Sequence, residues 1–394
     1  MIVLIVLCFC TLCAAQNTKE LPADLRTLDS DHYIIHSDLD DDLTADLAHR
    51  MDVMFEEYSR RLCDFSPPQD APKLEVYLFA RRHDYMRLTG DRFPNTGGIF
   101  ISSQNLLAVF LETQGRDGIR RTLQHEAFHQ FAQAAIGGDI PVWLNEGIAQ
   151  IFEEGIWNGR TFLIGQVPPS RVRQLQEDIR ENRLTDFGAF INRSAAEWAS
   201  NLRYKPIAIT QYNQAWAMTQ FLIYATDERG RPKYRDRLLD MLRLIHAGED
   251  GHSAFVEAFS ENTAGFQNLF NEWAHNLGPT AEATYAEHQA ILADMLISLG
   301  AQGRQFADIG SFRRCLDDGG YRLQSSGSGN LQPGAVFCDL AGRPMGPRQL
   351  YFAPAPGSAA PDIICHPADD LELRTHFLRG DGGTLDYETV VQSE

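Results

Sequence analysis

Basic side chains are scarce in this 394-residue sequence, which has 35 Lys and Arg residues against 53 Asp and Glu residues. Binding to the phosphates of a nucleic acid requires clustered Lys and Arg, and no basic stripe is present in the sequence. We therefore expect no nucleic acid partner. The net charge of −18 is interpreted as an aid to solubility, and a weak preference for cationic peptides is the alternative.

A hydrophobic run long enough to cross a membrane, which takes roughly 20 residues, is also missing. Residues 1–15 (MIVLIVLCFCTLCAA) are apolar but shorter than that. They lack the basic residues that usually open a signal peptide, but Cys13 and Ala15 suit cleavage before Gln16. We interpret 1–15 as a secretory signal, which predicts a secreted or periplasmic protein without a membrane span.

Cysteine is rare as well, with seven residues in the chain, and three of these lie within residues 1–15. Outside residues 1–15, the cysteines form no C-x-x-C pair or zinc-ribbon spacing, which argues against those redox and structural zinc sites. In an exported protein the remaining cysteines permit disulfides. We predict one bridge in the C-terminal region and leave Cys63 unassigned; the alternative is that all four are free. The four are Cys63, Cys315, Cys338 and Cys365.

The order of sequence patterns predicts the fold class. Residues 30–136 show a strand, a helix, a strand, a short helix, a hairpin and a long helix over 115–136. From residue 141 the patterns are mainly helical, with one helix expected over 144–154 and another over 208–227. The expected class is α+β, with a small mixed sheet and a helical lobe together in one domain, residues 16–300.

A second domain is expected after Gly300, where Gly, Pro and Ser become frequent. Short apolar runs between these residues predict strands. We interpret 301–394 as a small β-rich accessory domain. The predicted strands are 335–339, 349–353, 362–365 and 384–391.

A metal-binding pattern lies inside the helix expected over 115–136. His125-Glu126-Ala127-Phe128-His129 is an H-E-x-x-H motif, in which the two histidines are four residues apart. Residues four apart on a helix lie on one face, so both imidazoles can reach one ion while Glu126 stands beside it. By itself the motif is also compatible with a solvent-facing helix that carries two incidental histidines.

Glu146 is the expected third ligand, since a catalytic zinc site takes three protein ligands and keeps a position open for water. Gly137-Gly138 supplies a flexible turn after the first helix, and a second helix can then return along it. Glu146 stands among apolar residues, where a buried carboxylate needs a partner. The alternative is an ordinary acidic residue in the first turn of a helix.

The segments HEAFH and PVWLNEGIAQ together resemble the gluzincin metallopeptidases, in particular the peptidase-MA-like families of uncharacterised secreted bacterial proteins. The resemblance covers roughly residues 30–290. It implies a zincin-like catalytic domain with Zn²⁺ as cofactor, His125, His129 and Glu146 as ligands, and Glu126 as general base. It also implies hydrolysis of peptide bonds in peptide or protein substrates.

Two related classes fit less well. Aminopeptidases of this type have a G-x-M-E-N strand motif, and the corresponding segment 96–100 (TGGIF) lacks the acidic residue. Metzincins have a third histidine soon after the second, and residues 130–139 contain none.

The edge segment 97–103 remains a candidate for pairing with an extended peptide.

Further residues are assigned to the site with weaker support. Gluzincins often place a tyrosine after the third ligand to stabilise the oxyanion, which makes Tyr212 the candidate and Tyr204 its rival. Tyr212 also lies on an apolar helical stripe, which is typical of a core residue. Gln150, one helical turn beyond Glu146, is a candidate for orienting the histidine ligands, although an ordinary polar helix position is the alternative.

Three other functions remain open. A non-catalytic zinc-containing protein that captures peptides would keep the metal ligands but would not need Glu126. An adhesion or cell-envelope protein would use 301–394 for its main role. A hydrolase of non-peptide amides would use the same metal chemistry. The sequence does not define the oligomeric state, the cleavage preference, or whether cleavage is internal or terminal.

Overall fold

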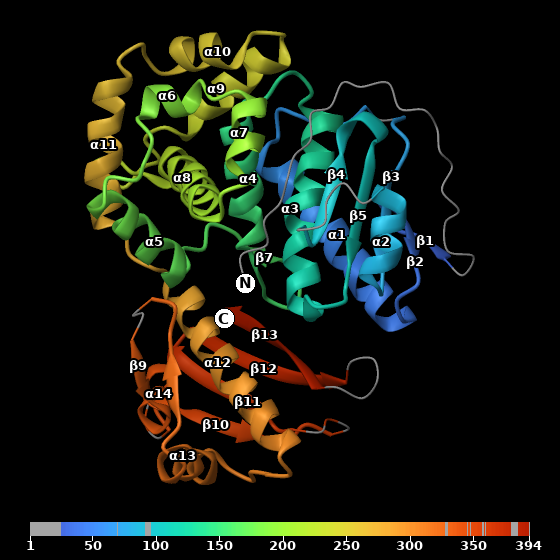
Figure 1. Ribbon diagram of the computed structural model, residues 1–394, viewed down its shortest axis with the longest axis vertical. Helices are drawn as coiled ribbons and strands as arrows, with labels where there is room; N and C mark the ends of the chain where they lie inside the picture. Colours follow the sequence, from blue (N-terminus) through green and yellow to red (C-terminus); the bar gives the residue numbers. More distant parts are fainter. Residues whose placement is uncertain are drawn as a thin grey trace. The chain divides into compact units, whose positions relative to one another are not determined.

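A computed structural model describes most of the chain, which divides into two compact units (Figure 1). The first unit comprises the described residues up to Glu154 together with Gln174–Leu277, and the second comprises Gly155–Arg173 together with the chain from Gly278. The predicted signal segment, 1–15, lies outside the described residues. These are 25–68, 70–90, 96–327, 330–344, 346, 348–356, 358, 360–379 and 385–393.

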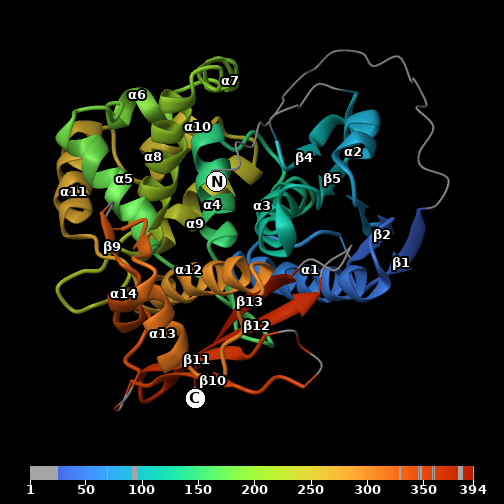
Figure 2. The same ribbon diagram turned by 60° about the horizontal axis from the view of Figure 1, so that its bottom comes forward.

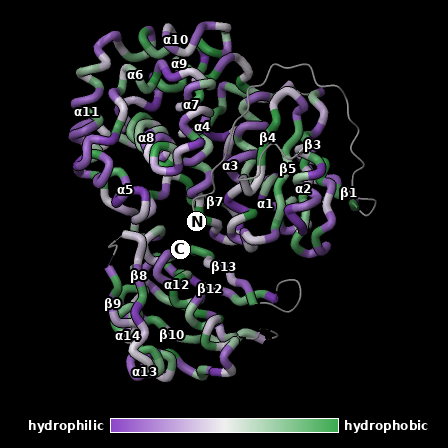
Figure 3. Tube along the Cα trace, viewed as in Figure 1, coloured by the Kyte–Doolittle hydropathy of each residue, from purple (hydrophilic) through white to green (hydrophobic). Residues whose placement is uncertain are grey.

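The first unit is built on a five-stranded mixed sheet with the strand order β1-β2-β3-β5-β4. The inner strands β2, β3 and β5 are parallel, and the outer strands β1 and β4 are antiparallel to their neighbours. Figure 3 shows β3 and β5 mainly in the hydrophobic colour, as expected for strands covered on both faces. The strands are β1 (Arg26–Asp29), β2 (Tyr33–Ser37), β3 (Leu74–Phe79), β4 (Gly98–Ile101) and β5 (Leu106–Phe110).

Helices cover both faces of this sheet. On one face lie α1 (Asp41–Arg61) and α3 (Gly115–Ala135), which also contact each other (Figure 1). On the other face lies α2 (Arg82–Thr89), which buries Tyr85 in a cluster with side chains of β3, β4 and β5. These strand residues alternate with the residues that face α3. The strand alternation therefore leaves Gly98 and its even-numbered neighbours facing α3, the helix that carries the H-E-x-x-H motif.

A helical lobe completes the first unit. Its central helix is α8 (Lys205–Tyr224), which is buried almost all round between Ala208 and Leu222. The sequence patterns predicted this helix but not α6, α7 and α10. The other helices are α4 (Val142–Glu153), α6 (Phe187–Ile191), α7 (Ala195–Asn201), α9 (Arg235–His246), α10 (Gly251–Ala258) and α11 (Thr263–Asn276); α5 (Pro169–Arg180) spans the division between the units.

The second unit contains a four-stranded antiparallel sheet, β10-β11-β12-β13, with α12 (Ala281–Ala301) lying along it (Figure 2). We expected this unit to begin at residue 301, but it begins at 278 and also takes up 155–173. The reason is that α12 buries Leu292, Leu296 and Leu299 in the core of this unit. The strands are β10 (Leu350–Ala353), β11 (Asp362–Ala368), β12 (Leu371–Arg379) and β13 (Leu385–Ser393).

Smaller elements complete the second unit, and one of them corrects a prediction. Residues 335–339, predicted to be a strand, belong to the helix α14 (Gly334–Leu340). Short apolar runs do not by themselves distinguish a buried strand from a buried helix. The remaining elements are β6 (Ile156–Trp157), β7 (Phe162–Leu163), α13 (Ile309–Asp318), β8 (Arg322–Gln324) and β9 (Leu331–Pro333).

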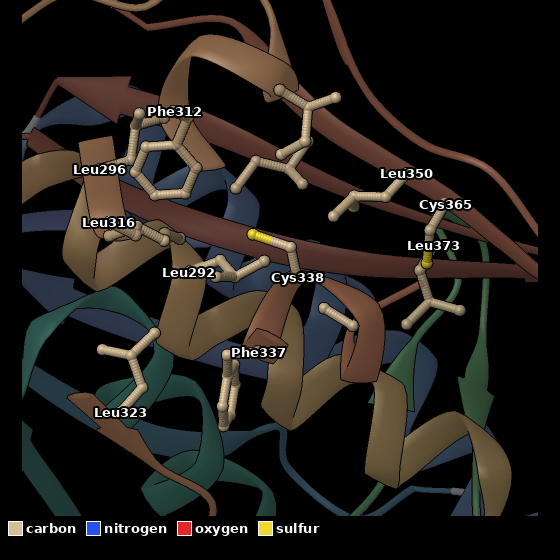
Figure 4. Packing of buried hydrophobic residues seen from close by; sticks show 14 of the residues in the cluster. Leu292, Leu296, Phe312, Leu316, Leu323, Phe337, Cys338, Leu350, Cys365 and Leu373 are labelled. Carbon is tan, nitrogen blue, oxygen red and sulfur yellow. The ribbon is translucent and has the colours of Figure 1, made fainter. Parts of the chain in front are cut away.

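The predicted disulfide in the C-terminal region is wrong, because all four cysteines outside 1–15 are free thiols. Cys338 and Cys365 are both buried in the apolar core of the second unit, but Figure 4 shows that their sulfur atoms do not point toward each other. A disulfide requires directed Cβ–S vectors as well as proximity. Burial raises the pKa of each of these two thiols to about 12, so both stay protonated.

The predicted α+β class is confirmed by the mixed sheet with its helices and by the antiparallel sheet of the second unit. Within the part of the chain that the structure describes, no helix has the length and apolarity required to cross a membrane.

An ion-paired carboxylate joins α1 to α3. Asp46 accepts a hydrogen bond from Arg120 of α3 at 2.8 Å and one from Arg50 at 2.8 Å. Burial raises the pKa of Asp46, but the charges of Arg120 and Arg50 outweigh that effect and hold its pKa below the usual range. The ionised form is therefore the one that stabilises the fold.

We predict that Asp46→Asn lowers the free energy of unfolding by about 1–2 kcal/mol at neutral pH. The difference from wild type should be full above the ordinary Asp pKa of about 4. It should disappear as the pH falls through the lower folded-state pKa of Asp46, since a depressed carboxyl pKa stabilises only the ionised protein. Urea unfolding of both proteins between neutral and acidic pH measures this, and a difference independent of pH would contradict it.

Candidate metal centre

The helix α3 presents His125, Glu126 and His129 at fixed positions because it is tied to its neighbours along its length. The Tyr58 hydroxyl of α1 donates to the carbonyl of Gln124 at 2.6 Å. The side chain of Gln124 in turn donates to the carbonyl of Phe152 in α4 at 2.8 Å. Near the other end, Gln130 donates to the carbonyl of Glu75 in β3 at 3.0 Å. The motif therefore lies on a helix anchored to α1, α4 and the sheet.

The chain reverses between α3 and α4 through Gly137 and Gly138, which have φ angles of +63° and +67°. Side chains other than that of glycine rarely adopt this conformation. A Cβ on Gly138 would also lie 2.5 Å from the carbonyl oxygen of Ile245, so the turn packs closely on α9. Pro141 then precedes the first turn of α4, which carries Glu146 back to α3.

The three expected ligands, His125, His129 and Glu146, meet at one point. One ligand atom from each lies within 4.8 Å of the other two. Glu146 Oε2 is 3.2 Å from His125 Nε2 and 3.9 Å from His129 Nε2. All three residues are buried, and Glu146 is completely inaccessible to solvent. A single ion can therefore be bound by the two imidazoles and the carboxylate.

Three buried polar atoms at this point have no hydrogen-bond partner among the described residues: His129 Nε2, Glu146 Oε1 and Glu126 Oε1. Buried polar atoms are normally paired, so such a concentration needs an explanation. Two imidazole nitrogens and a carboxylate form a donor set typical of a catalytic zinc site. The residues present therefore fit a Zn²⁺ ion.

Two side chains of α4, neither of them predicted from the sequence, orient the histidine rings. Glu153 Oε2 lies 3.0 Å from His125 Nδ1, and Asn145 Oδ1 lies 3.1 Å from His129 Nδ1. Each contact holds Nδ1, so that Nε2 of the same ring faces the metal point. Glu153 lies two helical turns after Glu146, and Asn145 directly precedes Glu146. Both could have been found by considering the polar residues of α4 next to the third ligand and two turns beyond it.

Electrostatics at the centre follow from burial and from the neighbouring carboxylates. Burial alone lowers the pKa of His125, but hydrogen bonds to Glu146 and Glu153 reverse the shift and raise it to about 10. Burial and the nearby His125 lower the pKa of His129 well below its usual value. Burial raises the pKa of Glu126 to about 8. A metal ion would displace the proton of His125, since only a neutral imidazole ligates.

Glu126 lies beside the three ligands, on the side of the edge strand β4. Its Oε2 accepts a hydrogen bond from the backbone N–H of Phe100 at 2.7 Å. Its Oε1 is the unpartnered atom named above. The carboxylate is thus held through one oxygen, and the other is available to a further group.

The helix α8 approaches α4 closely at the third ligand. A Cβ on Gly147 would lie 2.1 Å from the Thr219 hydroxyl and 2.6 Å from the carbonyl oxygen of Ala215, so only glycine fits there. Gln150, a candidate for orienting a histidine, donates to the carbonyls of Glu146 at 3.1 Å and Tyr212 at 3.0 Å. It therefore joins α4 to α8.

The two candidate tyrosines have different surroundings. Tyr212 is buried on α8, and its ring packs edge-on against Trp198 at 5.3 Å between centroids. Its pKa is raised well above the usual value, first by burial and then by the charge of Glu146. Tyr204 is 64% exposed and precedes the first residue of α8.

A family described as a protein of unknown function (DUF1570) matches residues 119–232. The matched segment contains the three expected ligands and also Glu126, Glu153 and Tyr212, so the whole centre except Phe100 lies within it. No curated protein matches the sequence.

We predict that Glu153→Ala weakens zinc binding by about 10- to 100-fold, because His125 loses the partner that fixes its ring. Glu154→Ala is the matched control. Both glutamates form an ion pair with Arg121, whose Nη2 lies 2.6 Å from Glu154 and 3.6 Å from Glu153. Competition with a fluorescent zinc chelator measures both affinities. Equal loss in the two variants would contradict a specific role for Glu153.

Proposed function

We propose that the chain is a zinc-dependent peptidase of the gluzincin type. The observation that carries this proposal is the buried group of His125, His129 and Glu146, with the second carboxylate of Glu126 beside it. Three protein ligands leave a coordination position open for water and substrate, which is the arrangement of catalytic zinc sites. Residues 1–15 are proposed to direct export, so the substrates are peptides outside the cytoplasm.

The residues around the ion have separate tasks in this proposal. A bound Zn²⁺ supplies Lewis-acid chemistry, which polarises the scissile carbonyl and acidifies water. Glu126 Oε1 accepts the proton of the attacking water and then delivers it to the nitrogen of the leaving amine. The burial of Glu126 disfavours the charged form of its carboxylate, which helps this base to return its proton to the leaving group.

Glu126 supports a catalytic site over a purely structural or peptide-capturing one. A structural zinc is closed by four protein ligands and needs no base. Here a fully buried carboxylate with an unpartnered oxygen adjoins the ligands, although burying it is costly. That cost is understandable if the carboxylate takes part in proton transfer.

Tyr212 is proposed to stabilise the developing oxyanion. Its backbone carbonyl accepts a hydrogen bond from Gln150 of α4, and burial, followed by the charge of Glu146, raises the pKa of its hydroxyl, which therefore stays neutral and able to donate. A donor placed where negative charge develops is among the strongest contributions an enzyme can make. The packing of the ring against Trp198 limits the positions that the hydroxyl can take.

The proposed activity is tested by incubating the mature, zinc-loaded protein with a mixed peptide library and reading cleavage by mass spectrometry. We predict cleavage by wild type and a loss of at least about 1,000-fold in Glu126→Gln, which keeps the size of the side chain but removes the base. Chelation should abolish cleavage, and added Zn²⁺ should restore it. Folded, zinc-loaded wild type that cleaves nothing would favour the non-catalytic peptide-binding alternative.

We further predict that Tyr212→Phe lowers kcat by about 10- to 1,000-fold with little change in KM, because an oxyanion donor acts mainly in the transition state. The matched control is Tyr204→Phe, which removes the hydroxyl of the exposed rival. Steady-state kinetics on one peptide from the library measures both variants. A larger effect in Tyr204→Phe would exchange the two assignments.

A further inference from the structure

The edge strand β4 directs alternate backbone groups to its two sides. The carbonyl of Gly97 accepts a hydrogen bond from the N–H of Phe110 at 3.3 Å, so the backbone polar groups of Gly97 point toward β5. In an antiparallel pair the N–H and C=O of one residue point to the same side, and successive residues alternate. Phe100 therefore turns its N–H and C=O away from β5, toward the outer edge of the sheet, and there its N–H meets Glu126.

We propose that the backbone N–H of Phe100 is a positioning group for the general base, an inference that rests on the proposed function. The 2.7 Å bond to Glu126 Oε2 is in the range of a charge-assisted hydrogen bond. With Oε2 held, rotation of the carboxylate is restricted and Oε1 keeps one direction. Oε1 has no other partner in the described chain, so it is the oxygen that remains for the attacking water.

The donor itself is fixed relative to α3 without the help of Glu126. Gln114 donates to the carbonyl of Gly97 at 2.8 Å and accepts from the Thr122 hydroxyl of α3 at 2.9 Å. A Cβ on Gly98 would lie 2.6 Å from Thr122 Cγ2, so strand and helix touch there. Both attachments are made at Thr122, one helical turn before Glu126, and they set the distance between β4 and α3 there.

In this arrangement the strand β4 would serve both the alignment of the substrate and the positioning of the general base. An extended peptide lying along β4 would find the carbonyl of Phe100 on the free edge, because the N–H of that residue is already used. The strand that aligns the peptide would then also hold the carboxylate that activates water. Geometry of this kind matters, since a displacement of about 1 Å can cost about 100-fold in rate.

The test replaces the amide of Phe100 by an ester, through incorporation of the α-hydroxy acid analogue of phenylalanine, which removes the N–H and keeps the side chain. We expect kcat on a library peptide to fall about 10- to 100-fold, with KM and zinc content unchanged. The control is the same replacement at Ile101, whose N–H faces β5 and not Glu126. A kcat that is unchanged at Phe100, or that falls equally at Ile101, would overturn the proposal.

Hydrogen exchange gives a readout that does not depend on activity. In wild type the Phe100 amide should exchange slowly although it faces the free edge of the sheet, and in Glu126→Ala it should exchange at least about 10-fold faster. Equally fast exchange in both proteins would overturn the proposal. If wild type cleaves no peptide, the proposed function fails, and the exchange rates still decide whether Phe100 holds Glu126.

Discussion

A carboxylate that is completely inaccessible to solvent has to be compensated, and Glu146 is such a group. Burying an unpaired charge costs several kcal/mol, and the contacts of Glu146 with His125 and His129 offset that cost. The rest of the centre depends on these contacts. The Gly137–Gly138 turn and the close approach of α8 at Gly147 both serve to bring Glu146 to this point. Without a cation, the same packing would leave three buried polar atoms unsatisfied.

The first unit surrounds this contact with fixed neighbours. Hydrogen bonds from Tyr58 and Gln124 tie α3 to α1 and α4, and the ion pair of Asp46 with Arg120 attaches α1 to the same helix. Glu153 and Asn145 hold the histidine rings, and the edge strand holds Glu126. The positions of the three candidate ligands are thus supported by hydrogen bonds from several neighbouring elements, as a preorganised site requires.

The parts predicted from the sequence were those with a local signal. The sequence predicted that His125, His129 and Glu146 meet at one point. That prediction followed from the four-residue spacing of the two histidines and from the second helix expected to begin just before Glu146. The roles of Glu153 and Phe100 were missed, because one depends on a contact between two helices and the other on a backbone group. The segment 335–339 was assigned to the wrong element, since an apolar run fits either a helix or a strand. The start of the second unit was misplaced because α12 packs with strands far along the chain.

The most direct test of the central claim is X-ray absorption at the zinc edge on the purified, zinc-loaded protein. The account predicts one zinc per chain with a four-coordinate shell of nitrogen and oxygen atoms at about 2.0–2.2 Å. Outer-shell scattering from two imidazoles should be present, and the signal of one imidazole should be lost in His129→Ala. A shell that contains sulfur, a shell without imidazole, or a folded protein that retains no zinc would contradict the account.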